Sequence, residues 1–208
     1  MMQQPHPRLV VFTKAPVPGN AKTRLIPALG AAGAAVLAHR MLVHTLQHAL
    51  AAHVESVELC MSPAPGHAAW QDVTLPKGLQ CTTQGEGDLG ERMAAAIERV
   101  TRRHHQPVLL MGTDCPGLAA ELISEAACQL QTHDAVIVPV ADGGYALIGL
   151  KSPCPELFTR MPWSTSTVAK KTLRRLAALG LSVWQGPVLH DIDEPADLHH
   201  LPFYFLTK

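Results

Sequence analysis

The 208-residue sequence predicts an α/β fold with a mostly parallel sheet, and two observations support this prediction. Short runs of apolar β-formers, such as Leu9–Phe12 and Val108–Met111, alternate with longer segments whose apolar residues recur at helical spacing. Each run ends in a loop that contains Gly or Pro. A chain of this length can bury about 70% of its unfolded surface in one domain. Because no repeat or linker divides it, we expect residues 1–208 to form a single domain.

In the first half of the chain, strands and helices alternate. The strand Leu9–Phe12 is wholly apolar, which is typical of a strand that is buried on both faces. A helix is expected over residues 30–52, because apolar residues recur there on one side. Short strands are expected near residues 57–61 and 79–83. Asp88 can then cap a second helix.

The second half continues the alternation. The strand Val108–Met111 leads into a helix, and a strand over residues 135–140 leads into a hairpin. The segment M-P-W-S-T-S-T-V begins another helix, with Ser164 or Thr165 as its cap. We expect Asp197 to cap or open a last short helix.

The composition limits the kind of partner. Lys+Arg and Asp+Glu both total 17, so no net charge attracts nucleic acid or an anionic membrane. The five Cys are scattered without a C-x-x-C pair, which argues against a disulfide framework or zinc knuckle. The sequence shows no signal-peptide pattern and no apolar run of membrane-spanning length. We therefore expect a cytoplasmic protein that binds neither nucleic acid nor membrane, and a homodimer is compatible with the sequence.

The loop after the first strand concentrates positive charge in Lys14, Lys22 and Arg24. Ligands of open α/β sheets bind outside the carboxyl ends of the strands, where such a loop suits a phosphate group. The loop is not a P-loop, because that motif requires Gly where this chain has Pro16 and Ala21. The dinucleotide fingerprint G-x-G-x-x-G is also absent after the first strand, so no nicotinamide or flavin is expected.

Two later parts of the chain carry carboxylates that could bind a metal ion. Asp114 comes directly after the buried strand, where an unpaired carboxylate is costly. A divalent cation would offset that cost, and Asp114 is the leading candidate metal ligand. The alternatives are a helix cap or a salt bridge to the basic loop. Asp191 and Asp193 would point the same way in an extended segment, so a second carboxylate for the same cation could come from there.

Two glycine-rich turns are candidates for ligand contact. The turn at residues 84–88 could let the backbone approach a base or sugar closely, or it could be only a loop before a helix cap. The turn Asp142-Gly143-Gly144 predicts a hairpin between two β-like runs. Tyr145 follows it directly, where its ring could line a pocket or pack in the core.

Several segments together carry a resemblance to a known family: F-T-K-A-P-V-P-G-N-A-K-T-R-L, G-D-L-G-E-R-M, G-T-D-C-P, D-G-G-Y-A-L-I-G, W-S-T-S-T-V and D-I-D-E-P-A-D-L. In this order they resemble a bacterial family of glycosyltransferase-A-like proteins linked to radical-SAM or arsenosugar gene clusters and related to 2-phospholactate guanylyltransferase. The match runs over about residues 9–201. It implies the nucleotide-diphospho-sugar transferase fold, a three-layer α/β/α sandwich that binds a nucleotide at the carboxyl edge of a mostly parallel sheet.

The resemblance also implies roles for single residues. Asp114 and Asp193 match the metal-binding aspartates, with Asp191 as the alternate, for Mg²⁺ or Mn²⁺. The sequence T-D-C-P is closer to the D-x-P of nucleotidyltransferases than to the D-x-D of many glycosyltransferases of this fold. The residues expected to bind the nucleotide are Lys14, Gly19, Lys22, Thr23, Arg24, Gly85, Asp88 and Arg92, and those expected to bind the substrate are Asp142, Gly143, Gly144, Tyr145, Trp163 and Ser164.

The preferred hypothesis for function is Mg²⁺-dependent nucleotidyl transfer from a nucleoside triphosphate to a small phosphorylated or acidic acceptor. The catalytic residues would be Lys14, Lys22 and Arg24, which neutralise charge on the phosphates, and Asp114, which holds the Mg²⁺ ion on the phosphate oxygens. One alternative is glycosyl transfer from a nucleotide sugar to a small-molecule acceptor. The other is a nucleotide-binding module without catalytic activity.

Overall fold

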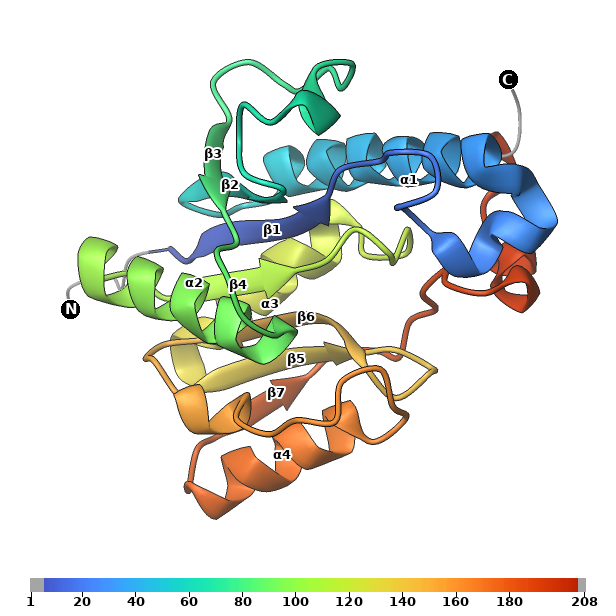
Figure 1. Ribbon diagram of the computed structural model, residues 1–208. Coiled ribbons are helices and arrows are strands. Elements are labelled where there is room, and N and C mark those ends of the chain that lie inside the picture. The colour runs from blue at the N-terminus through green and yellow to red at the C-terminus, as the bar shows by residue number, and fades with distance from the viewer. Residues whose placement is uncertain (1–5, 206–208) are drawn as a thin grey trace.

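The computed structural model describes residues 6–205. A seven-stranded sheet forms the middle layer, and helices cover both of its faces (Figure 1). This three-layer α/β/α arrangement confirms the predicted fold class. The sheet order is β3-β2-β1-β4-β6-β5-β7. The strands are β1 (Arg8–Lys14), β2 (Ser56–Ser62), β3 (Gln80–Thr83), β4 (Val108–Met111), β5 (Ala135–Pro139), β6 (Tyr145–Leu150) and β7 (Val183–Gln185), and the helices are α1 (Ile26–Ala51), α2 (Leu89–His104), α3 (Ala120–Thr132) and α4 (Val168–Ala178).

The order of the strands creates a switch point at the centre of the sheet. Strand β1 pairs in parallel with β2 on one side and with β4 on the other. The chain runs outward from β1 through β2 and β3 and then crosses to β4, whereas β6 is antiparallel to both β4 and β5. The loops after β1 and β4 therefore leave the same edge of the sheet side by side, where open α/β sheets bind their ligands.

Alternation along β1 divides the core between the two faces. Leu9 and Val11 pack with residues of α1 and α3, and Val10 and Phe12 pack with residues of α2 and α4. Successive side chains of a strand point to opposite faces, so a strand covered on both sides needs apolar residues at every position. This requirement explains the uninterrupted apolar run that predicted the strand.

Helix α1 is long, and Gly30 interrupts its helical geometry with a φ of 71°. Together with the preceding turn it spans Thr23–Ala51, and among residues 6–205 it is the one helix long and apolar enough to cross a membrane by length and composition. That finding corrects the expectation that no segment reaches this length. Leu42 and Leu46 pack against the sheet, whereas Leu37 packs against the C-terminal segment that lies beside the start of α1 (Figure 1).

The predicted helix cap was confirmed at α2 and was wrong at α4. Asp88 caps α2 in a capping box with Glu91, as predicted. The residue before α4 is Thr167 rather than Ser164 or Thr165, and its side chain makes no capping hydrogen bond. The three-residue strand β7 was not predicted, because so short a segment shows no clear alternation.

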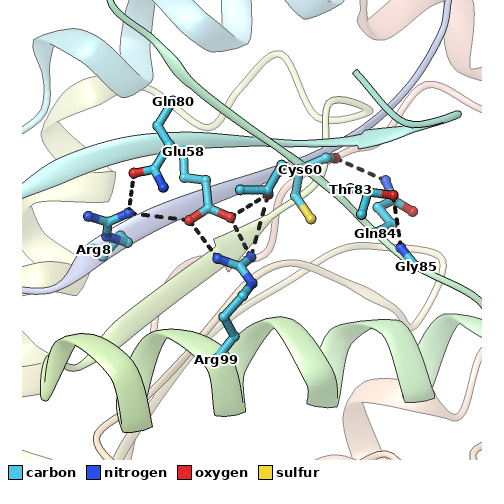
Figure 2. A network of polar contacts seen from close by, with 9 residues as sticks. Arg8, Glu58, Cys60, Gln80, Thr83, Gln84, Gly85 and Arg99 are labelled. Carbon is cyan, nitrogen blue, oxygen red and sulfur yellow. Dashed lines mark hydrogen bonds and ion pairs between the residues drawn. The ribbon is translucent and has the colours of Figure 1, made fainter. Parts of the chain in front are cut away.

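Glu58 of β2 is a fully buried carboxylate at the centre of a polar network (Figure 2). Both guanidinium nitrogens of Arg99 donate to it, from Nη1 to Oε2 at 3.0 Å and from Nη2 to Oε1. Arg8 Nη1 lies 3.3 Å from Oε2, and the Thr82 hydroxyl donates to Oε1 at 2.6 Å. Burial opposes ionisation of Glu58, but the hydrogen bonds and charges of these partners outweigh it and lower its pKa. The network therefore links α2 to strands β1, β2 and β3 of the sheet.

Replacing Glu58 should be costly. We expect Glu58→Gln to lower the free energy of unfolding by about 3 kcal/mol at pH 7, because it leaves two largely buried guanidinium groups without their counter-charge. The folded-state pKa is depressed, so the contribution is complete above the unfolded pKa of about 4.3 and is lost as the pH falls through the folded value. Urea unfolding at several pH values measures both effects.

The matched control is Glu98→Gln on α2, the helix that carries Arg99. Glu98 pairs with Arg102 at 3.0 Å, but both side chains are more than half exposed. This exposed pair should contribute less than about 1 kcal/mol. Equal losses for Glu58→Gln and Glu98→Gln would contradict the role assigned to the buried network.

Candidate functional site

A cleft of about 820 Å³ opens at the carboxyl ends of β1, β2 and β4. The loops that follow β1 and β4 form its floor, and the first turns of α2 form one wall. Residues near the hairpin before β6 and in the loop before α4 form a second wall, and Asp191 and Asp193 of the C-terminal segment also line the cleft. The cleft therefore lies at the switch point of the sheet.

Lys22 lies at the floor of the cleft and contacts two aspartates, Asp114 and Asp193. Its ammonium donates to Asp193 Oδ1 at 2.9 Å and also pairs with Asp114 Oδ1. A third hydrogen bond goes to the carbonyl oxygen of Ile192 at 2.6 Å. An ammonium group has three donors, so these three acceptors engage it fully.

The charge of Lys22 is buried, whereas its partners face the cleft. The Lys22 side chain is 7% exposed, compared with 53% for Asp114 and 40% for Asp193. Burial alone would lower the pKa of Lys22, but the charges and hydrogen bonds of the two carboxylates outweigh burial and raise it. The salt bridge between Asp114 and the basic loop, which the sequence left open as an alternative, is therefore present.

The backbone brings these three segments together. The parallel pairing of β1 with β4 places the loops that carry Lys22 and Asp114 side by side. Lys22 has a left-handed backbone conformation, with a φ of 47°, directly before the 3₁₀ turn Thr23–Leu25. The N–H group of Ile192 donates to the carbonyl oxygen of Asp114 at 2.9 Å, which fixes the C-terminal segment against the β4 loop.

The other two cations of the loop are held less firmly. Arg24 is 56% exposed, and its Nη1 lies 3.9 Å from Asp193 Oδ2 and 3.8 Å from Glu194 Oε1. Lys14 lines the cleft at the end of β1 and is exposed. Within residues 6–205, Lys14 makes no ion pair. Both side chains can therefore turn toward an anion in the cleft at little cost.

The acidic side of the cleft includes Asp142 and Asp191. Asp142 Oδ1 accepts a hydrogen bond from the Gly144 N–H at 2.7 Å. Burial, followed by the nearby charge of Asp142, raises the pKa of Asp191 to about 6. Within the described residues, no three His, Cys, Asp or Glu side chains converge in a way that could hold a metal ion by themselves.

Gln84 is a cleft residue that the sequence did not single out. Its amide nitrogen donates to the Thr13 carbonyl oxygen of β1 at 2.9 Å and to the Cys60 carbonyl oxygen of β2 at 3.1 Å, and Figure 2 shows the contact with Cys60. Its amide oxygen accepts from Arg92 Nη1 at 2.8 Å. Gln84 therefore ties the first turns of α2 to two strand ends and orients Arg92, which also lines the cleft.

Two aromatic side chains, Tyr145 and Trp163, line the second wall. The rings of Tyr145 and Trp163 are 6.5 Å apart and nearly perpendicular. Burial raises the pKa of Tyr145, so its hydroxyl stays protonated. The Trp163 indole packs against Gly90 of α2, where an added Cβ would lie 3.0 Å from its nitrogen. This contact joins the two walls of the cleft.

The cleft lining includes most of the predicted site residues. The expected residues that do not line it are Gly19, Gly85, Asp88 and Gly143. Gly143 has a φ of 92°, and a Cβ there would lie 2.1 Å from the Ser166 carbonyl oxygen, so its place is explained by backbone packing. Asp88 is engaged as the cap of α2. The expected residues that line the cleft are Lys14, Lys22, Thr23, Arg24, Arg92, Asp114, Asp142, Gly144, Tyr145, Trp163, Ser164, Asp191 and Asp193.

We expect Gln84→Ala to lower the free energy of unfolding by about 2 kcal/mol, because it removes three hydrogen bonds and leaves the Arg92 guanidinium without this partner. Chemical unfolding followed by circular dichroism measures the change. Gln47→Ala, on the exposed side of α1, is the control and should change stability by less than about 0.5 kcal/mol. A Gln84→Ala protein as stable as this control would show that the network is not structural.

Comparison with known proteins places the chain in a family. The model of a family described as "uncharacterized protein conserved in bacteria (DUF2064)" matches residues 45–165. The protein belongs to this DUF2064 family. No curated protein matches the sequence.

Solved structures show how widely the DUF2064 chain shares its fold. A protein from Desulfovibrio desulfuricans G20, provisionally named a nucleotide-diphospho-sugar transferase, is 32% identical, with a TM-score of 0.86 over 94% of this chain and 85% of that one. Rv0371c from Mycobacterium tuberculosis H37Rv, solved with manganese, is 16% identical, with a TM-score of 0.55 over 95% and 98%. The inositol-1-phosphate CTP transferase from T. maritima is 12% identical, with a TM-score of 0.52 over 99% and 96%. At the two lower identities the likeness shows the fold alone.

Proposed function

We propose that this protein is a divalent-metal-dependent transferase that moves a nucleotidyl group from a nucleoside triphosphate to a small phosphorylated or acidic acceptor, within a single domain. The observation that supports it most is the meeting of the basic loop with Asp114 and Asp193 at the switch point of the sheet. The CTP transferase among the structures of this fold supports nucleotidyl chemistry. The resemblance to 2-phospholactate guanylyltransferase supports the acceptor class.

The residues present fit a metal ion. Mg²⁺ is usually held by one or two carboxylates together with substrate phosphates and water, rather than by a complete protein cage. Asp114 and Asp193 each place an oxygen beside the same ammonium nitrogen, so both can reach one cation, and Asp191 is the alternate on the same segment. When bound, the cation would polarise phosphate oxygens and offset their charge.

The reaction needs positioning and charge more than covalent help from the protein. An acceptor oxygen attacks the α-phosphorus, the bond to the β-phosphate oxygen breaks, and pyrophosphate leaves. Lys14, Lys22 and Arg24 neutralise the charge that develops on the phosphates, from a loop that the fold holds in place. Because these cations line the floor of the cleft, the triphosphate lies along the basic loop.

The two walls then divide the substrates. Arg92, held by Gln84, borders the nucleotide, and Gly85 follows Gln84 in the turn but does not itself line the cleft. Tyr145, Trp163 and Ser164 border the acceptor on the second wall, and Asp142, which also lines the cleft, can accept a hydrogen bond from a hydroxyl group of the acceptor.

Glycosyl transfer is the second candidate function. The provisional naming of the 32% identical protein as a nucleotide-diphospho-sugar transferase favours it. The same floor would then stabilise a departing nucleoside diphosphate. The product distinguishes the two: pyrophosphate supports nucleotidyl transfer, and nucleoside diphosphate supports glycosyl transfer.

The first experiment is a thermal-shift screen of nucleoside triphosphates and nucleotide sugars with and without Mg²⁺, since a ligand that binds only the folded state raises its apparent stability. The triphosphate that binds is then assayed for pyrophosphate release with phosphorylated and acidic acceptors. We expect Asp114→Asn to slow turnover about a hundredfold, because the metal ion that offsets charge in the transition state loses a carboxylate ligand.

Asp72→Asn removes an exposed carboxylate that does not line the cleft and serves as the control. It should retain the wild-type rate. Full metal-dependent activity in a folded Asp114→Asn protein would overturn the assignment of Asp114.

A further inference from the structure

Lys22 stands where the proposed function would put a metal ion. Its ammonium lies between Asp114 and Asp193, and both partner atoms are the Oδ1 oxygens of their carboxylates. Its third donor is engaged by the Ile192 carbonyl oxygen. In this arrangement Lys22 has no N–H left for a phosphate. Lys22 and the two aspartates therefore satisfy each other, so Lys22 is not free to bind a phosphate and the aspartates are not free to bind a metal ion.

We propose that Lys22 occupies the cation position of the nucleotide-free protein, so that the divalent metal enters together with the nucleotide and not before it. The inference rests on the proposed function and deepens it. The incoming phosphates give the Lys22 ammonium new acceptors, and Asp114 and Asp193 are then free to take the metal that the nucleotide carries.

The charges explain this order. The two carboxylates and Lys22 together carry a net charge of about −1, so most of the attraction for a free cation is already satisfied. A divalent cation beside the ammonium would also meet a like charge within a few ångströms. A nucleoside triphosphate brings several negative charges into the same space, so the site then attracts a divalent cation.

The geometry allows the exchange. The Lys22 side chain reaches the aspartates from the protein side and is 7% exposed, whereas both carboxylates are at least 40% exposed toward the cleft. An ammonium on a flexible four-carbon stem can change partners without moving the backbone. The other loop cations cannot play this part in the free protein, because Arg24 lies 3.9 Å from Asp193 and Lys14 makes no ion pair within the described residues.

Mn²⁺ binding to the nucleotide-free protein tests the proposal without an activity assay. Electron paramagnetic resonance follows free Mn²⁺ during a titration of wild type and Lys22→Gln. We expect Lys22→Gln to bind Mn²⁺ at least about tenfold more tightly, because the competing charge is gone. The double variant Lys22→Gln/Asp114→Asn should lose this gain, which would locate the ion at these carboxylates.

Lys14→Gln is the matched control, since it removes the same charge from the same cleft without a carboxylate partner. It should bind Mn²⁺ within about twofold of wild type. A similar gain in Lys14→Gln and Lys22→Gln would show a general effect of net charge and would overturn the proposal.

Thermal unfolding provides a second test. In the presence of a chelator, Lys22→Gln should melt at a lower temperature than wild type, because two aspartates lose their counter-charge. Added Mn²⁺ should restore the melting temperature of the variant and leave that of wild type nearly unchanged. A folded Lys22→Gln protein that binds Mn²⁺ no better than wild type overturns the proposal.

Wild type alone also decides the question should Lys22→Gln fail to fold. Tight Mn²⁺ binding without nucleotide, with a Kd below about 10 μM, would show a ready-made metal site and contradict the inference. Absence of nucleotide binding or turnover would instead count against the proposed function, and the Mn²⁺ comparison would still be readable.

Discussion

The contact of Lys22 with Asp114 and Asp193 is the interaction on which the cleft depends. It joins a loop near the N terminus, the end of a central strand and a segment near the C terminus, and the Ile192–Asp114 backbone hydrogen bond reinforces it. Without it, the two carboxylates would share one end of the cleft, and within residues 6–205 Arg24, 3.9 Å from Asp193, would be their remaining paired cation. The parallel pairing of β1 with β4 makes this meeting possible, because it aligns the two strand ends.

Features that depend on local sequence could be predicted. The strand Val108–Met111 has the predicted bounds, because a strand covered on both faces must be apolar throughout and a glycine ends it. Asp88 was recognised as a helix cap from its place before an amphipathic segment. Because open α/β sheets bind ligands outside the carboxyl ends of their strands, the sequence also predicted that the basic loop and Asp114 contribute to one site.

Features that depend on distant neighbours could not be predicted. Gln84 and Glu58 are ordinary polar residues in the sequence, and their importance comes from strand ends and arginines that only the fold places beside them. The predicted cap at Ser164 or Thr165 is wrong, because α4 begins after Thr167, where the Ala169 N–H donates to the distant Gly143 carbonyl oxygen at 2.8 Å. Helix α1 packs against two separate clusters of the core, although only 28% of its most apolar stretch is buried, and length and composition alone do not distinguish such a helix from one that crosses a membrane.

The buried carboxylate of Glu58 also specifies how strands are aligned. Strand β3 is a four-residue edge strand with mostly exposed side chains, so hydrophobic patterning fixes its register only weakly. Thr82 of β3 donates to Glu58, and in the observed alignment Glu58 lies opposite Gln80. A slip of one residue would turn the partners of Glu58 to the wrong face and leave a buried charge unsatisfied. The network therefore favours the observed register of β3 on β2, at an edge of the sheet where hydrophobic patterning alone would permit other registers.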